Sequence, residues 1–116
     1  MTEVELARST ETSSDTLMSL VYNWDWGVRY FLAGNLKTPP TGLDVLAYDE
    51  KSLVRHVVAL HPYVSLETLF VLIGDRDDDV RRAAAHHPNA PPAAKLWAFS
   101  EYRNSMSLKE FLETVQ

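Results

Sequence analysis

A nine-residue pattern that occurs twice, 26 positions apart, constrains the fold of this chain more than any other feature. Residues 54–62 read VRHVVALHP and residues 80–88 read VRRAAAHHP. A step of 26 towards the N-terminus reaches Val28 and Arg29, so the valine–arginine pair occurs three times at one spacing. A fixed period of this length is typical of chains in which similar units are stacked. We therefore predict a repeat architecture.

Each copy of the pattern predicts an amphipathic helix. Apolar residues follow the first valine at i+3 and i+4, as in Val54, Val57 and Val58, and so share one helical face. The helix should begin at the valine–arginine pair and end at the histidine–proline pair, because proline disfavours helical geometry in the preceding residue. Shorter helices are predicted near residues 43–48 and 69–74, where Leu43, Leu46 and Asp49 recur as Leu69, Leu72 and Asp75.

The complete pattern resembles a known class of repeat. A Leu-x-x-Leu segment, an acidic turn and then Val-Arg-x-x-Val-Ala-x-His-Pro, over roughly residues 16–101, is similar to the leucine-rich-repeat-variant family and, more distantly, to HEAT-like helical repeats. The resemblance implies a stacked helical scaffold. Members of that family can carry a cysteine-ligated iron–sulfur cluster, but this chain has no cysteine, which excludes that cofactor. We expect no cofactor.

The expected fold is all-α: a short right-handed helical-repeat solenoid of about three 26-residue repeats plus a half repeat. Residues 1–15, rich in threonine, serine and glutamate, are predicted to form a flexible N-terminal arm before a repeat domain over residues 16–104. Residues 105–116 are predicted to form a capping helix, because Ser107 and Glu110 have the spacing of a capping box. The alternative role for this helix is dimerisation, and a homodimer is the expected oligomeric state.

Composition narrows the classes of function. Eleven basic and sixteen acidic residues give a net charge of −5, which disfavours binding to nucleic-acid phosphates. No apolar stretch approaches the ~18 residues of a membrane span, and the acidic N-terminus does not resemble a signal peptide, so the cytoplasm is the expected compartment. The four glycines form no phosphate-binding loop, and no catalytic constellation is recognisable, so we do not expect an enzyme.

Two sets of polar residues recur at the same 26-residue interval as the pattern. Arg29, Arg55 and Arg81 each follow an acidic or amide residue by six positions: Asn23, Asp49 and Asp75. These arginines could form an anion-binding stripe, or each could tie the turn of its own or the neighbouring unit; we favour the second, because residues repeated within one chain usually serve the repeat.

His61 and His87 form the other set. Zinc binding is an alternative for them, but no further ligand type repeats beside them, so we predict no metal site. We expect the two histidines to contact the last carbonyl groups of helices.

The segment from Tyr22 to Gly27 departs from the repeat. Trp24 and Trp26 stand where the next two units have charged or polar residues. With Tyr22 and Tyr30 they are predicted to form a partner-binding surface, because aromatic side chains often dominate binding at interfaces. The alternative is that the tryptophans pack beneath the N-terminal arm as a cap.

The sequence therefore predicts a non-catalytic protein–protein interaction module, a small cytoplasmic regulator or inhibitor that binds the surface of a partner protein. The alternative is a nucleic-acid-binding helical repeat protein in which the three arginines contact phosphates.

Overall fold

A computed structural model describes residues 1–115, and all regular secondary structure in this range is helical. A 3₁₀-helix, η1 (Glu101–Asn104), precedes the last α-helix. The α-helices are α1 (Glu3–Arg8), α2 (Ser14–Ser19), α3 (Trp26–Gly34), α4 (Pro40–Leu46), α5 (Ser52–Leu60), α6 (Leu66–Ile73), α7 (Asp78–Ala85), α8 (Pro92–Ala98) and α9 (Leu108–Thr114). The predicted all-α class is confirmed for these residues. None of the helices within residues 1–115 has the length and apolar character needed to cross a membrane.

The helix starts keep the period read from the sequence. The helices α3, α5 and α7, which contain the valine–arginine pairs, begin one period apart, at Trp26, Ser52 and Asp78. The same interval separates the starts of α2, α4, α6 and α8, at Ser14, Pro40, Leu66 and Pro92. The helices α3, α5 and α7 begin two residues before the valine–arginine pair rather than at it. The reason is that the extended N-cap residue lies further upstream, at Asp25, Lys51 and Asp77.

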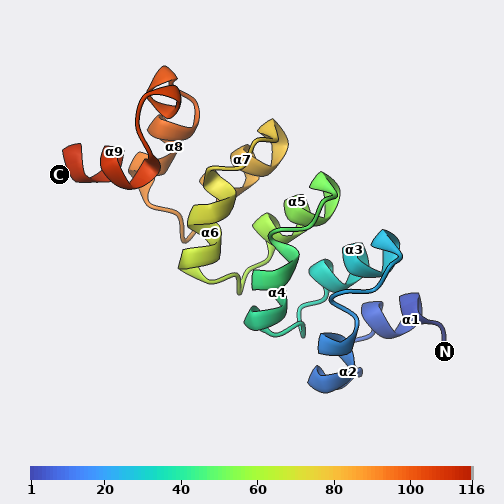
Figure 1. The fold of residues 1–116 in the computed structure, drawn as a ribbon. Coiled ribbons are helices and arrows are strands. Elements are labelled where there is room, and N and C mark those ends of the chain that lie inside the picture. The colour runs from blue at the N-terminus through green and yellow to red at the C-terminus, as the bar shows by residue number, and fades with distance from the viewer. Residues whose placement is uncertain (116) are drawn as a thin grey trace.

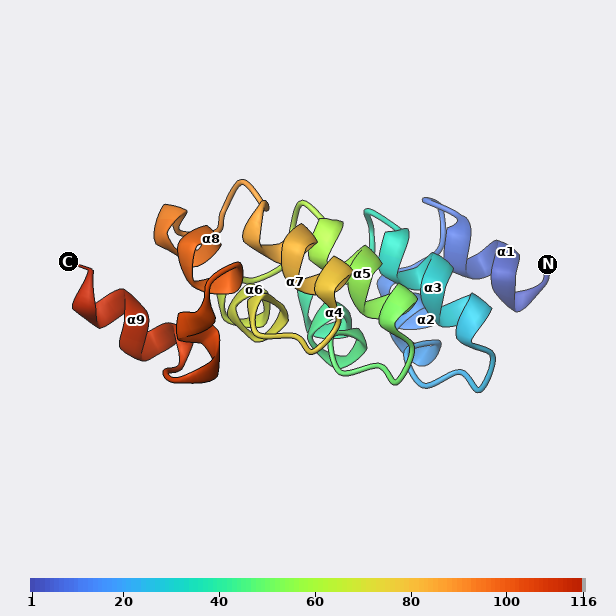
Figure 2. The ribbon, with the colours of Figure 1, turned by 90° about the horizontal axis from the view of Figure 1, so that it is seen from above.

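The helices lie in two rows (Figure 1). In one row α1, α3, α5 and α7 pack against one another in chain order. The helices α2, α4, α6 and α8 follow one another along the other row, and a second view shows the two termini at opposite ends (Figure 2). The molecule is elongated, with extents of 50 × 21 × 16 Å. Equivalent turns therefore follow one another along the long axis.

The core is built from the same positions in successive copies. The helices α2, α4 and α6 fully bury one leucine each, at Leu17, Leu43 and Leu69. The helices α3, α5 and α7 bury Leu32, Val58 and Ala84 at one position and Ala33, Ala59 and Ala85 at the next. Burying a side chain as large as leucine stabilises a fold by about 1.5–3 kcal/mol. The recurring apolar positions therefore hold the two rows together.

The N-terminal segment differs from the flexible arm that the sequence predicts. Residues 3–8 form α1, which packs against α3, with Ala7 fully buried. A capping box between Thr2 and Glu5 begins the helix. The Thr12 hydroxyl donates to the Leu6 carbonyl (2.8 Å), and the equivalent bond recurs one repeat later, from Thr38 to Leu32 (2.6 Å). The expected half repeat is therefore a complete helix pair, hidden in the sequence because the valine–arginine pair is missing from it.

The C-terminal helix α9 begins at the predicted capping box of Ser107 and Glu110. It packs against α8 and buries Leu108 and Phe111. The Trp97 indole N–H donates to the Met106 carbonyl (2.9 Å), which fixes the segment before α9 to α8. This helix therefore covers apolar surface at the end of the two rows.

Candidate interaction surface

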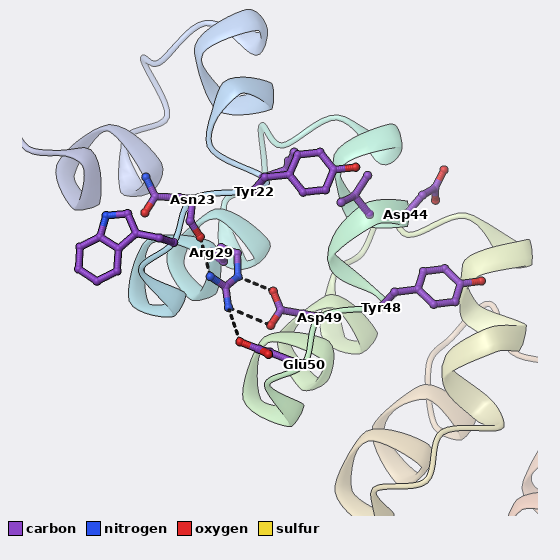
Figure 3. A pocket seen from close by; sticks show the side chains of 10 residues that line it. Tyr22, Asn23, Arg29, Asp44, Tyr48, Asp49 and Glu50 are labelled. Atoms are coloured by element: carbon purple, nitrogen blue, oxygen red, sulfur yellow. Dashed lines mark hydrogen bonds and ion pairs between the residues drawn. The ribbon is translucent and has the colours of Figure 1, made fainter.

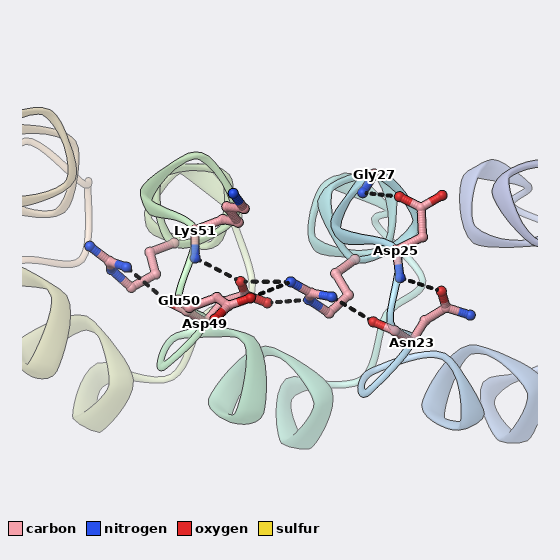
Figure 4. Close-up of polar contacts among 8 residues, drawn as sticks. Asn23, Asp25, Gly27, Asp49, Glu50 and Lys51 are labelled. Atoms are coloured by element: carbon pink, nitrogen blue, oxygen red, sulfur yellow. Dashed lines mark hydrogen bonds and ion pairs between the residues drawn. The ribbon is translucent and has the colours of Figure 1, made fainter.

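The turns that lead into α3, α5 and α7 share one hydrogen-bond pattern. Asn23, Asp49 and Asp75 each accept, through a side-chain oxygen, the backbone N–H two residues further on, at 3.0, 2.9 and 2.8 Å. Figure 4 shows the first two of these turns. Such a local bond fixes the backbone of a turn. The backbone of each of these turns is therefore held by a side chain of the turn itself.

Arg29 and Arg55 connect each turn to the next. The Arg29 Nη1 donates to the Asn23 carbonyl (2.5 Å), while Nε and Nη2 donate to the Asp49 carboxylate (2.6 and 3.2 Å). Arg55 repeats the arrangement with the Asp49 carbonyl (2.7 Å) and the Asp75 carboxylate (2.8 and 3.2 Å). Each guanidinium therefore holds the carbonyl of its own turn and the carboxylate of the following turn.

Arg81 ends this series differently. Its Nη1 donates to the Asp75 carbonyl (3.1 Å), as the repeat requires, but its Nε donates to the Ala98 carbonyl (3.1 Å). Its remaining contact is with the Asp78 carboxylate, which is exposed. The last arginine therefore lacks the buried carboxylate that the other two have.

The three arginine side chains are buried and are not accessible to a ligand. Arg29, Arg55 and Arg81 are only 8%, 4% and 6% exposed. The hydrogen bond with Asp49 raises the pKa of Arg29 above its ordinary value, and the negative charges of Asp49, Glu50 and Asp25 add to this effect, against the opposing effect of burial. Each guanidinium group is hydrogen-bonded within the protein, so the three arginines do not form a stripe that an external anion could bind.

Histidines make a second series of contacts at the opposite turns. His61 Nε2 lies 3.0 Å from the Asn35 carbonyl, and His87 Nε2 lies 2.9 Å from the His61 carbonyl. In both rings Nδ1 accepts a backbone N–H, from Tyr63 and Asn89, at 3.0 Å. Because Nδ1 accepts, the ring proton is on Nε2, which donates to the preceding unit. Asn35 makes the same two kinds of contact: its Nδ2 donates to the Ser9 carbonyl, and its Oδ1 accepts the backbone N–H of Lys37.

The structure separates the four aromatic residues that the sequence grouped as a partner-binding surface. Trp24 is 88% exposed and Tyr22 is also exposed. Trp26 is 40% exposed, packs edge-on against Tyr30 at 6.2 Å between ring centroids, and lies beneath the Lys51 Nζ at 5.8 Å. Tyr22 and Trp24 are therefore the most exposed of the four, and Trp24 is not covered by the N-terminal segment.

Tyr22 and Trp24 line an open groove of about 730 Å³. The groove lies between the turn after α2 and the turn after α4, and its lining residues are Val21, Tyr22, Asn23, Trp24, Arg29, Asp44, Val45, Tyr48, Asp49 and Glu50. Figure 3 shows Tyr22 and Tyr48 projecting to the same side of the Arg29–Asp49 pair, the side on which Asp44 lies. The sequence reasoning missed Tyr48, although Tyr48 follows Tyr22 by exactly one repeat length.

Three carboxylates, of Asp44, Asp49 and Glu50, line the same groove as these aromatic rings. Asp44 accepts from the Thr68 hydroxyl (2.5 Å), and the Glu50 side chain is 83% exposed with its nearest cation, Arg29, at 4.0 Å. The Asp49 carboxylate already forms an ion pair with Arg29. The groove therefore combines aromatic faces with negative charge, a set of groups suited to non-covalent binding.

Comparison with protein-family models, with curated proteins and with solved structures found no match to this chain. The resemblance to the leucine-rich-repeat-variant family therefore stays a prediction from the residues.

Proposed function

We propose that the chain is a short right-handed helical-repeat solenoid that acts as a non-catalytic protein–protein interaction module, a small cytoplasmic regulator or inhibitor. The support for the solenoid is the constant interval between helix starts together with the two series of contacts that join successive units. In stacked repeats each unit contacts mainly its neighbours, and the surface along the stack binds partners.

The observation that carries the proposed function is the exposure of Tyr22 and Trp24 on one groove. Two large aromatic side chains stand in solvent although the groove offers room to bury them against another molecule. Exposed aromatic rings at a concave surface mark binding sites, and tyrosine and tryptophan dominate the energetics of interfaces. Trp24 is therefore the proposed anchor of the contact.

The nucleic-acid alternative loses the feature on which it depended. It required Arg29, Arg55 and Arg81 to contact phosphates, but these side chains are buried and bonded within the protein. Affinity for a phosphate backbone comes from accessible lysine and arginine side chains.

Two single variants test the proposed function. Each replaces a tryptophan by the residue at the equivalent position of the next unit, Trp24→Glu or Trp26→Ser, and both proteins are compared with wild type in affinity capture and thermal melting. Trp24→Glu should abolish capture of the partner and leave the melting temperature unchanged, because this side chain touches solvent. Trp26→Ser is the matched control: it should lower the melting temperature, because it removes the contact with Tyr30. Unchanged capture by Trp24→Glu would rule out this surface.

A further inference from the structure

We infer that the groove between the α2–α3 and α4–α5 turns binds a partner segment that carries lysine or arginine. Tyr22, Tyr48, Asp44 and Glu50 recognise the cation, beside the proposed anchor Trp24. This inference rests on the proposed function and specifies the chemistry of the partner. It concerns side chains that the internal contacts of the repeat leave accessible.

The aromatic rings provide the first half of the recognition. Tyr22 and Tyr48 are exposed, occupy the same position in successive units, and project to the same side (Figure 3). A cation above the face of an aromatic ring is attracted by the ring quadrupole. The protein makes such contacts internally: the Arg8 guanidinium lies 4.9 Å from the Phe31 ring centroid, and the Lys51 ammonium lies 5.8 Å from that of Trp26.

The charges provide the second half. The lining contains three carboxylates, Asp44, Asp49 and Glu50, and one cation, Arg29. Arg29 and Asp49 neutralise each other in a bidentate pair, so Asp44 and Glu50 leave the groove negative. The chain as a whole carries a net charge of −5. A segment with positive charge is therefore complementary both to the groove and to the protein around it.

The next unit along the chain shows that the repeat does not require the groove residues Asp44, Tyr48 and Glu50. There the Arg55–Asp75 pair reproduces the Arg29–Asp49 pair. The groove residues, however, change: Asp44, Tyr48 and Glu50 are replaced at the equivalent positions by Phe70, Gly74 and Arg76. The supporting framework is thus the same in both places, but the next unit has Phe70 and Arg76 at the positions of Asp44 and Glu50, and it keeps only one of the two tyrosines, Tyr48 at the position of Tyr22. The role of Asp44, Tyr48 and Glu50 is therefore to contact another molecule rather than to support the repeat.

The first experiment identifies the chemistry that the groove selects. A random dodecapeptide library displayed on phage is panned on the wild-type protein, after depletion on the double variant Tyr48→Gly/Glu50→Arg. This variant carries the residues that the next unit has at these positions, so its fold should be retained, which circular dichroism checks. Lysine and arginine should be over-represented in the selected peptides relative to the unselected library.

The second experiment measures the contribution of charge. A selected peptide is synthesised, and its affinity is determined by fluorescence anisotropy for wild type, Glu50→Arg and the matched control Arg76→Glu. Glu50→Arg should weaken binding by about tenfold, because it replaces an attractive charge by a repulsive one, and the affinity for wild type should fall as salt is raised. Arg76→Glu lies outside the groove and should leave the affinity within about twofold, since surface charges at a distance are screened.

The outcomes separate the two proposals. Selected peptides that bind wild type but not the double variant, and that lack lysine and arginine, would overturn the inferred chemistry while leaving the groove as a binding site. Equal affinity of wild type and Glu50→Arg for a selected peptide would also overturn it. Failure to select any peptide that depends on the groove would count against both the inference and the proposed interaction surface.

Discussion

Replacing Arg55 by methionine should be among the most destabilising single changes in this protein. Methionine keeps the unbranched apolar stem of the side chain but lacks the guanidinium group, and so removes the bonds to the Asp49 carbonyl and the Asp75 carboxylate. The Asp75 side chain is only 8% exposed and would keep one donor, the Asp77 N–H at 2.8 Å. Breaking a buried ion pair by removing one partner costs about 3–5 kcal/mol, mainly because the remaining charge stays desolvated. This is a large part of the ~5–15 kcal/mol that stabilises a domain.

The same change at Arg81 is the matched control. Arg81→Met also removes bonds to backbone carbonyls, of Asp75 and Ala98, but leaves no buried carboxylate without a cation, because Asp78 is exposed. Its cost should be about 1–3 kcal/mol, the range for unsatisfied buried acceptors. The Ala98 carbonyl also retains a second donor, the Arg103 guanidinium at 2.9 Å.

A double variant tests whether the unpaired Asp75 carboxylate causes the loss of stability in Arg55→Met. In Arg55→Met/Asp75→Asn the amide carries no charge but can still accept the Asp77 N–H, as Asn23 does for Asp25 in the first of these turns. It should recover part of the stability lost in Arg55→Met. Urea unfolding followed by circular dichroism gives each free energy of unfolding. Equal costs for Arg55→Met and Arg81→Met, or a double variant no more stable than the single one, would refute the argument that an unpaired buried carboxylate dominates.

Three further predictions concern the ends of helices, and each is checked by urea unfolding. His61→Ala should cost about 2 kcal/mol by leaving the Asn35 carbonyl without its donor, whereas His61→Asn should cost less, because Asn35 itself makes the equivalent contacts. Lys51→Asn should stabilise α5 by ~0.5–1 kcal/mol, because the present N-cap makes no side-chain hydrogen bond. The N–H groups of Val80 and, to a smaller extent, Asp79 lower the pKa of Asp77 below its ordinary value. Since such a carboxylate stabilises the fold above its unfolded-state pKa, the advantage of wild type over Asp77→Ala should diminish as the pH falls below about 4.

The sequence by itself determined the α-helices from α2 to α9 and their period. Helix ends depend on local signals, such as the prolines at Pro40 and Pro92 and the capping side chains of Ser13 and Ser65. Apolar spacing within one helix is equally local, so the buried leucines and valines could be assigned to one face. The first helix was missed because its unit lacks the valine–arginine pair, although the pair Leu6 and Ala7 lies one repeat before Leu32 and Ala33.

The tertiary structure decided which groups meet between units. The sequence placed each arginine six residues after an acidic or amide residue, but Arg29 bonds the carboxylate of Asp49, twenty residues ahead, because the fold brings the turn after α4 against it. It also decided that Trp24 is exposed while Trp26 is packed against Tyr30. Trp26 also lies beneath the Lys51 Nζ of the following turn, 5.8 Å from its ring centroid, a contact between distant parts of the chain that only the tertiary structure brings about.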